Sequence, residues 1–138
     1  MKISHFLFSF LHSLIEMRYN ETMKHDPLNT KLITEFPKLG ETYQSVKGGA
    51  FDLDTPSSAF YQEIFLPYVI ESIKNKDEKE IRHCLDFIED MMTSDNELEN
   101  NVAMAFILVP LFEERHNLDW DKLPFGKESK AYLEMWVF

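Results

Sequence analysis

Positive charge is missing from one long part of this sequence. No lysine or arginine occurs between Arg82 and Arg115. The carboxylates of the same stretch are Asp86, Glu89, Asp90, Asp95, Glu97, Glu99, Glu113 and Glu114. Soluble proteins normally mix both signs of charge on their surfaces, so acids without compensating bases create a local negative potential. Such a potential favours a cationic partner.

Cysteine and glycine are also scarce. The single Cys84 cannot form an internal disulfide, which fits a reducing compartment, so we expect a cytoplasmic protein. Four Gly against twelve Phe, with 44% hydrophobic residues, are typical of a packed globule and not of a disordered acidic tail. A chain of 138 residues buries enough surface for one stable domain, so neither a cofactor nor a disulfide is expected.

Long hydrophobic runs are absent as well. A membrane-spanning helix needs about 18 apolar residues in succession, and none is present, so we expect no membrane span. Residues 3–15 instead place apolar side chains at three- and four-residue steps, which predicts an amphipathic helix that packs on the core. The polar residues within this segment and the absence of small residues after it argue against a cleaved signal peptide.

The net charge of −10 is concentrated in the second part of the chain. Residues 1–50 hold six bases and five acids, whereas residues 51–138 hold eight bases and nineteen acids. An acidic surface repels phosphate groups and anionic lipid headgroups. We therefore expect neither direct nucleic-acid binding nor membrane binding.

Helix signals dominate from Thr55 onward. Thr55-Pro56 reads as a cap followed by proline in the first turn of a helix that extends to Lys76. Asp77 with Glu80 is an acidic variant of the capping box, and Ser94 with Glu97 repeats the device, so further helices are predicted to follow each pair. A last helix is predicted over residues 128–136.

Two prolines suggest how these helices are arranged. Pro67 and Pro110 lie 43 positions apart in similar apolar settings, and each is expected to kink its helix. This spacing is typical of HEAT-like helical pairs, although two units do not distinguish a repeat from coincidence. We predict an all-α single domain over residues 1–138, with a helical core at 55–138. Residues 26–54 are expected to be less regular, with a short helix stopped by Pro37 and another over 41–46.

No catalytic or metal site is predicted. Two Glu-x-x-His spacings, Glu80 to His83 and Glu113 to His116, resemble half of a carboxylate-bridged di-iron site. Their positions near helix ends favour solvated side chains instead. Cys84 is expected to be a small core residue, since it and the adjacent His83 point in different directions on a helix. The sequence therefore predicts a protein that is not an enzyme.

The acidic stretch remains the best candidate for a binding site. We expect its central members to contact a basic protein partner, namely Asp86, Glu89, Asp90, Asp95, Glu97 and Glu99. A solvated helix face is the alternative, because caps and the helix dipole account for acids such as Asp95 and Glu97. Capping does not explain why bases are missing, so the acids around the turn between the two helices carry the prediction.

Several short motifs resemble those of an uncharacterised bacterial family of small acidic helical proteins. They include Phe60-Tyr61-Gln62-Glu63, Phe87-Ile88-Glu89-Asp90, Val109-Pro110-Leu111 and the segment from Gly126 to Leu133. Proteins of that type look like immunity proteins of polymorphic toxin systems, including contact-dependent growth inhibition. The resemblance covers residues 55–136 and implies a non-catalytic inhibitor of a cognate, basic, nuclease-type toxin domain. An adaptor for another basic protein, or a metal-dependent helical-bundle enzyme, are the alternatives.

Overall fold

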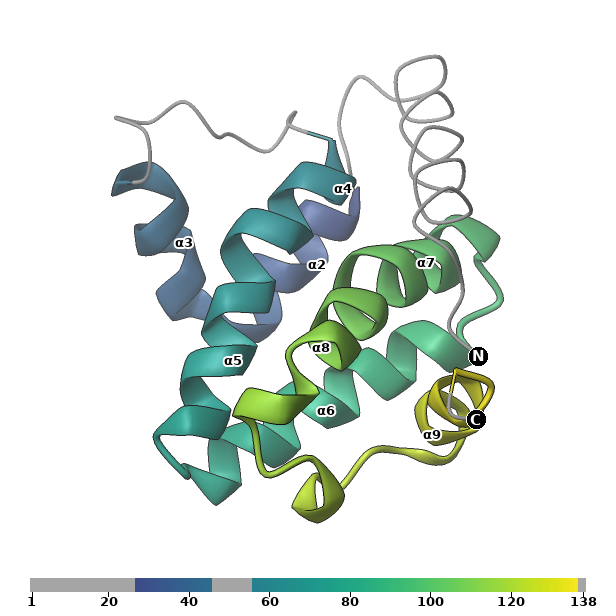
Figure 1. Ribbon diagram of the computed structural model, residues 1–138. Helices are drawn as coiled ribbons and strands as arrows, with labels where there is room; N and C mark the ends of the chain where they lie inside the picture. Colours follow the sequence, from purple (N-terminus) through teal and green to yellow (C-terminus); the bar gives the residue numbers. More distant parts are fainter. Residues whose placement is uncertain (1–26, 46–55, 137–138) are drawn as a thin grey trace.

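Helices make up most of the chain in the computed structural model, which describes residues 27–45 and 56–136 (Figure 1). No strand occurs within these residues, which confirms the predicted all-α fold of one small domain. The helix expected over residues 3–15 and the cap expected at Thr55 lie outside the described residues. No helix within the described ranges is long and apolar enough to cross a membrane.

Two long helices form the centre of the fold, and each contains a π-helical segment. The first consists of α4 (Ser57–Phe60), η2 (Tyr61–Phe65) and α5 (Leu66–Lys74), which follow one another without a break. The second consists of α7 (Glu97–Val102), η3 (Ala103–Leu108) and α8 (Val109–Glu113). The two π segments contact each other, so the widened turns of both helices meet in the core.

A proline follows each π segment at the same position. Pro67 and Pro110 are the second residues of α5 and α8. The residue before each proline donates its N–H to the carbonyl five residues back, from Leu66 to Tyr61 and from Val109 to Met104. Because proline lacks an N–H and its ring crowds the preceding turn, a wider turn accommodates it. The distortion predicted at both prolines thus takes the form of a π segment.

Each long helix is followed by a second helix. A short turn connects α5 to α6 (Glu78–Thr93), whereas two 3₁₀ turns, η4 (Arg115–Asn117) and η5 (Trp120–Lys122), lie between α8 and α9 (Lys127–Glu134). Helices α6 and α9 pack against each other (Figure 1). The helices thus form two pairs in sequence order. The first long helix is followed by α6, and the second long helix is followed by α9.

The predicted cap residue is correct for one helix and wrong for the other, and the reciprocal bond of a capping box is absent from the first, because the Asp77 N–H donates to the Ser72 carbonyl and Glu80 contacts His83. Asp77 is the N-cap of α6, and its carboxylate accepts a hydrogen bond from the Glu80 N–H at 3.2 Å. The N-cap of α7 is Asn96, whose side-chain oxygen accepts from the Leu98 and Glu99 N–H groups. Ser94 is not the cap; its hydroxyl donates to the Glu99 carboxylate and accepts from the Asn96 N–H. Asparagine is among the best N-cap residues, so Asn96 caps α7 in place of the predicted pair of Ser94 and Glu97.

The segment at 27–45 is more regular than the sequence predicts. It forms two helices of nine residues, α2 (Pro27–Glu35) and α3 (Pro37–Ser45). Pro37 ends the first helix, as expected, and also begins the second, since proline is favourable in the first turn of a helix. The second helix therefore starts four residues earlier than the predicted start at 41.

The core unites all these helices. Phe60, Tyr61 and Phe106 are completely buried, and the apolar residues 105–109 are all buried, as expected for a central helix. Tyr61 belongs to the first long helix, and its hydroxyl donates to the Leu28 carbonyl of α2 at 2.6 Å. A buried hydroxyl requires such a partner, so this bond fixes α2 against the central helices.

Candidate functional site

The six candidate binding acids lie on two consecutive helices and the turn between them. Asp86, Glu89 and Asp90 are on α6, Asp95 is in the turn, and Glu97 and Glu99 are in the first turn of α7. The side chains at 86, 90, 95 and 97 are exposed, whereas Glu89 is half-buried and Glu99 is buried. The structure therefore separates the set into exposed and inward-facing acids.

Glu99 is held inside the protein by a base that is distant in sequence. Glu99 is only 5% exposed. Its carboxylate forms an ion pair with Lys31 of α2 and accepts a hydrogen bond from the Ser94 hydroxyl at 3.0 Å. The Lys31 ammonium also lies 5.8 Å from the centroid of the Phe87 ring. A buried carboxylate requires such compensation. Lys31 thus neutralises one member of the stretch that lacks its own bases, and Glu99 joins α2 to α7.

Glu89 caps the last helix. Its carboxylate accepts hydrogen bonds from the N–H groups of Glu128 and Ser129 at 2.8 and 2.9 Å, and from the Ser129 hydroxyl at 2.8 Å. Although partial burial raises the pKa of Glu89, these three bonds outweigh it and bring the pKa below the usual value. A Cβ at Gly126 would stand 2.4 Å from Cδ of Glu89, so glycine leaves the space that the capping carboxylate fills.

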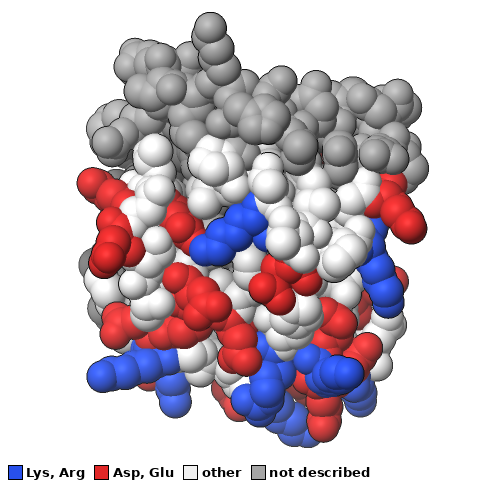
Figure 2. Space-filling view, turned by 180° about the vertical axis from the view of Figure 1, so that it is seen from behind, with Lys and Arg blue, Asp and Glu red and all other residues white. Residues whose placement is uncertain are grey.

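The remaining acids, Asp86, Asp90, Asp95 and Glu97, are called the exposed acids below. No base of the described residues forms an ion pair with Asp86, Asp90 or Asp95. Figure 2 shows the charges of the molecule from behind: Lys and Arg gather along the lower edge of this view, and Asp and Glu predominate above them. The two signs are thus partly segregated, which strengthens the local potential of each region.

His83 occupies a site that sequence reasoning missed. Its Nε2 lies 2.8 Å from Oε2 of Glu35 and its Nδ1 lies 3.1 Å from Oε1 of Glu80, while its ring stacks on Phe36 with centroids 4.2 Å apart. The hydrogen bond with Glu35 is the main reason why the pKa of His83 is raised; burial opposes it and Glu80 adds to it. Glu35 is 48 positions away in the sequence, so no local sequence pattern predicts the contact between Glu35 and His83.

Neither Glu-x-x-His spacing forms a metal site in the described part of the chain, where no group of three metal-binding side chains occurs. In the first motif His83 forms hydrogen bonds with both Glu80 and Glu35. In the second motif α8 ends at Glu113, and Glu113 and His116 are exposed, as expected near a helix end. Cys84 is buried, as predicted, and burial raises the pKa of its thiol to about 12, which leaves it protonated and unreactive at neutral pH.

Fold and site together define a small all-α protein whose six candidate acids are divided into two with internal partners, Glu89 and Glu99, and four that are exposed. The chain belongs to a family described as a domain of unknown function (DUF7674), which matches residues 29–125. The match begins within α2, includes α3 and ends before α9, so it reaches further toward the N-terminus than the motifs quoted above. No curated protein and no solved structure matches the chain.

Proposed function

We propose that this chain is a non-catalytic immunity protein that binds and neutralises a cognate, basic, nuclease-type toxin domain. One observation carries the proposal: Asp86, Asp90 and Asp95 are exposed and have no ion-pair partner among the described residues. Asp86 and Asp90 stand four residues apart on α6, where like charges destabilise a helix by about 0.2–0.5 kcal/mol. A cationic partner would turn this repulsion into attraction.

The chemistry of nuclease clefts supports a basic partner. A domain that acts on nucleic acid attracts phosphates with lysine and arginine, and those bases attract exposed carboxylates equally well. Complementary charge speeds association by roughly 10 to 1,000-fold and fixes the orientation of the complex. Inhibition would follow from covering the cleft, without any reaction of the bound protein. The immunity role itself rests on the resemblance of the motifs described above.

The internal roles of Glu89 and Glu99 narrow the docking surface. Reversing the charge of either residue would disturb the fold, because one caps α9 and the other pairs with Lys31. The exposed acids are therefore the ones to alter. A suitable variant is Asp86→Lys with Asp90→Lys and Asp95→Lys.

A control variant with the same charge is available. Glu71, Glu113 and Glu134 are exposed on α5, α8 and α9, and their reversal to lysine also changes the net charge from −10 to −4, two units for each substitution. Both variants and the wild type are co-expressed with the toxin domain encoded by the adjacent gene. Growth rescue and pull-down report binding in the cell, and calorimetry at several salt concentrations reports affinity.

We expect the variant at residues 86, 90 and 95 to bind at least tenfold more weakly, about 1.4 kcal/mol, and to lose growth rescue. Its affinity should also fall less steeply with salt, because fewer charges face the partner. The control variant should rescue growth. Equal affinities of the two variants would refute docking through the exposed acids. Binding of a basic neighbour without growth rescue would identify an adaptor instead of an immunity protein.

A further inference from the structure

A histidine of α6 contacts the place where α2 meets α3. Helix α2 ends at Glu35, α3 begins at Pro37, and Phe36 is the one residue between them. The three residues are called the α2–α3 joint below. His83 Nε2 lies 2.8 Å from the Glu35 carboxylate, and the His83 ring stacks on the Phe36 ring with centroids 4.2 Å apart. One side chain of α6 therefore contacts two neighbouring residues of the joint.

The surroundings of His83 suit the charged form of its ring. A carboxylate lies at each ring nitrogen, Glu35 at Nε2 and Glu80 at Nδ1, at 2.8 and 3.1 Å. An ionised carboxylate only accepts hydrogen bonds, whereas a neutral imidazole has one N–H donor and one acceptor nitrogen. Only the imidazolium can donate to both acids at once. Loss of the proton therefore leaves two acceptors facing each other at one of the two contacts.

Phe36 connects the His83 ring to the core. It is buried, and its ring lies 5.3 Å from both the Phe65 ring of η2 and the Phe87 ring of α6. A cation over an aromatic face is attracted to it, and a neutral imidazole lacks this attraction. Deprotonation of His83 thus weakens its contact with Phe36 as well as its contact with Glu35, and both contacts are at the α2–α3 joint.

His83 is the group in this cluster that changes its charge near neutral pH. Burial and the neighbouring Glu80 raise the pKa of Tyr68, the residue of α5 that contacts Phe36, so Tyr68 stays neutral up to pH 9. The thiol of Cys84 stays protonated as well. The other charged residues of α3 and of the adjacent turns of α6 form no bond with His83, namely Lys38, Glu41, Lys79, Arg82 and Asp86.

Two other polar contacts hold α2, and both are closer to its start. The Tyr61 hydroxyl donates to the Leu28 carbonyl, and Lys31 pairs with Glu99. Neither contact contains a histidine, so His83 supplies the pH-dependent contact at the end of the helix. We propose that His83 acts as a pH-sensitive switch in the fold: its protonated ring holds the α2–α3 joint on α6, and loss of the proton lets the joint open more often.

The direction of the effect follows from the raised pKa of His83, for which the hydrogen bond with Glu35 is the main cause. Such a group adds stability below its unfolded pKa of about 6.5, and this stability is lost as the pH rises through the folded pKa. The joint should therefore open least near pH 6 and most near pH 9. Because His83 and Glu35 are both partly exposed, solvent screens the pair, and we expect a change of about two- to fivefold in the opening equilibrium.

Amide hydrogen exchange of the full chain, measured by NMR from pH 6 to pH 9, reports this opening. The probes are the amides of residues 33–36, among them the Phe36 N–H that donates to the Leu32 carbonyl at 2.8 Å. The amides of residues 106–109 in the second long helix report global unfolding. Each observed rate is divided into the intrinsic rate at the same pH, which gives the protection of that amide. NMR signals of the His83 ring give its pKa.

Two test variants and two matched controls separate the contacts. His83→Gln and Glu35→Gln each remove one side of the contact between α6 and the joint. Glu80→Gln is a control because Glu80 and His83 both belong to α6, so their contact does not depend on whether the joint is open. His116→Gln removes an exposed histidine of η4. Urea unfolding of each variant verifies that it folds.

We expect the protection of residues 33–36 to be lower than that of residues 106–109 and to fall about two- to fivefold between pH 6 and pH 9. The fall should coincide with the titration of the His83 ring. His83→Gln and Glu35→Gln should show no such fall, and Glu35→Gln should lower the pKa of His83. Glu80→Gln and His116→Gln should keep the pH dependence of the wild type.

Four results would overturn the proposal. They are equal protection at residues 33–36 and 106–109, an unchanged pH dependence in His83→Gln, a His83 pKa at or below 6.5, and protection that rises with pH. The measurement uses the chain without any partner, so its outcome is independent of the test of the immunity role.

Discussion

Glu89 and Asp86 lie three residues apart on the same helix but serve different purposes. Glu89 is fixed by three hydrogen bonds to α9, whereas Asp86 is exposed and forms no side-chain bond to a described residue. Sequence reasoning placed both in one binding group, since both are acids on a stretch without bases. The partner of Glu89 begins 39 positions further along the chain, and only the packing of α6 on α9 brings them together.

Glu89→Gln should destabilise the protein at neutral pH by about 0.5–2 kcal/mol, the range measured for helix caps. An amide has one acceptor oxygen where the carboxylate uses two, and its NH₂ would face the donors of α9. The pKa of Glu89 is lowered in the folded state from the ordinary value of 4.5. Its stabilisation is therefore complete above that value and is lost as the pH falls through the lower, folded pKa.

Urea unfolding of the wild type and of Glu89→Gln between pH 3 and pH 7 measures this difference. The two unfolding free energies should differ most at pH 7 and converge in acid. Asp86→Asn is the matched control and should change stability little at either pH. A gap that persists at the lowest pH would show that the substitution acts through packing and not through the carboxylate charge.

At the scale of the element, α6 keeps an acid where a base would stabilise it. The last turn of α6 contains no basic residue, although a cation there interacts favourably with the helix dipole. Asp90→Lys would add that interaction and would replace the Asp86–Asp90 repulsion with a pair in the favourable order, acid before base. We expect a gain of about 0.5–1 kcal/mol in unfolding free energy.

Asp86→Lys provides the comparison for this prediction. Lysine at 86 would stand four residues after Arg82 and further from the helix end, so its gain should be clearly smaller. Chemical denaturation of the two variants at low salt decides the matter. Equal gains in unfolding free energy would contradict a role of the dipole at the C-terminal end of α6. A larger gain at 90 would mean that the natural residue is less stabilising than lysine, as expected where a residue serves binding.

Local signals predicted the elements better than their internal details. The apolar periodicity and Asp77 located α6 correctly, because both act within one helix. The π segments were not predicted: proline signals a disturbed turn, but the contact of η2 with η3 lies between helices that are distant in sequence. The cap at Asn96 was missed because Ser94 with Glu97 also fits a capping pattern, and only the backbone conformation distinguishes the two.

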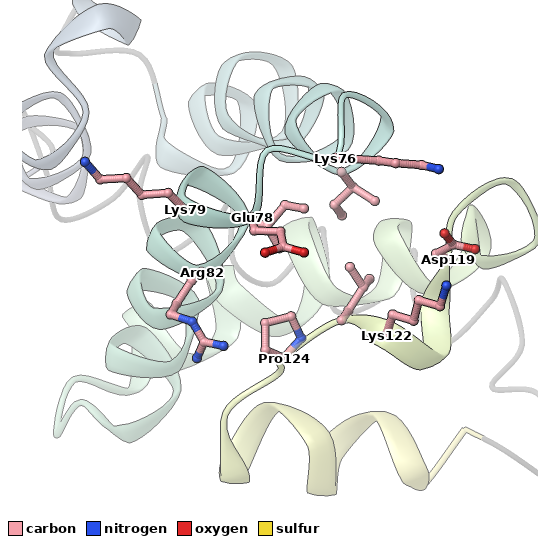
Figure 3. Close-up of a pocket in the computed structure, with 10 residues that line it drawn as sticks. Lys76, Glu78, Lys79, Arg82, Asp119, Lys122 and Pro124 are labelled. Carbon is pink, nitrogen blue, oxygen red and sulfur yellow. The ribbon is translucent and has the colours of Figure 1, made fainter.

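At the scale of the whole molecule, net charge predicted the kind of binding surface better than any single motif did. The positions of the charges in the fold were needed to locate that surface. The excess of acids is plain in the sequence, and the exposure of Asp86, Asp90 and Asp95 agrees with it. Lys76, Lys79 and Arg82 recur at three-residue steps just before the stretch without bases, and with Glu78, Asp119 and Lys122 they line one open pocket (Figure 3).

The same charge predicts how salt affects stability. A net charge of −10 opposes compact folding, and raising the ionic strength from about 0.01 M to 0.15 M shortens the screening length from about 30 to 8 Å. The urea midpoint of the wild type should therefore rise with sodium chloride at constant pH. The variant reversed at residues 86, 90 and 95, with a net charge of −4, should show a smaller rise. A midpoint that falls with salt would instead mean that attractive pairs such as Lys31 with Glu99 and His83 with Glu35 outweigh the repulsion among the acids.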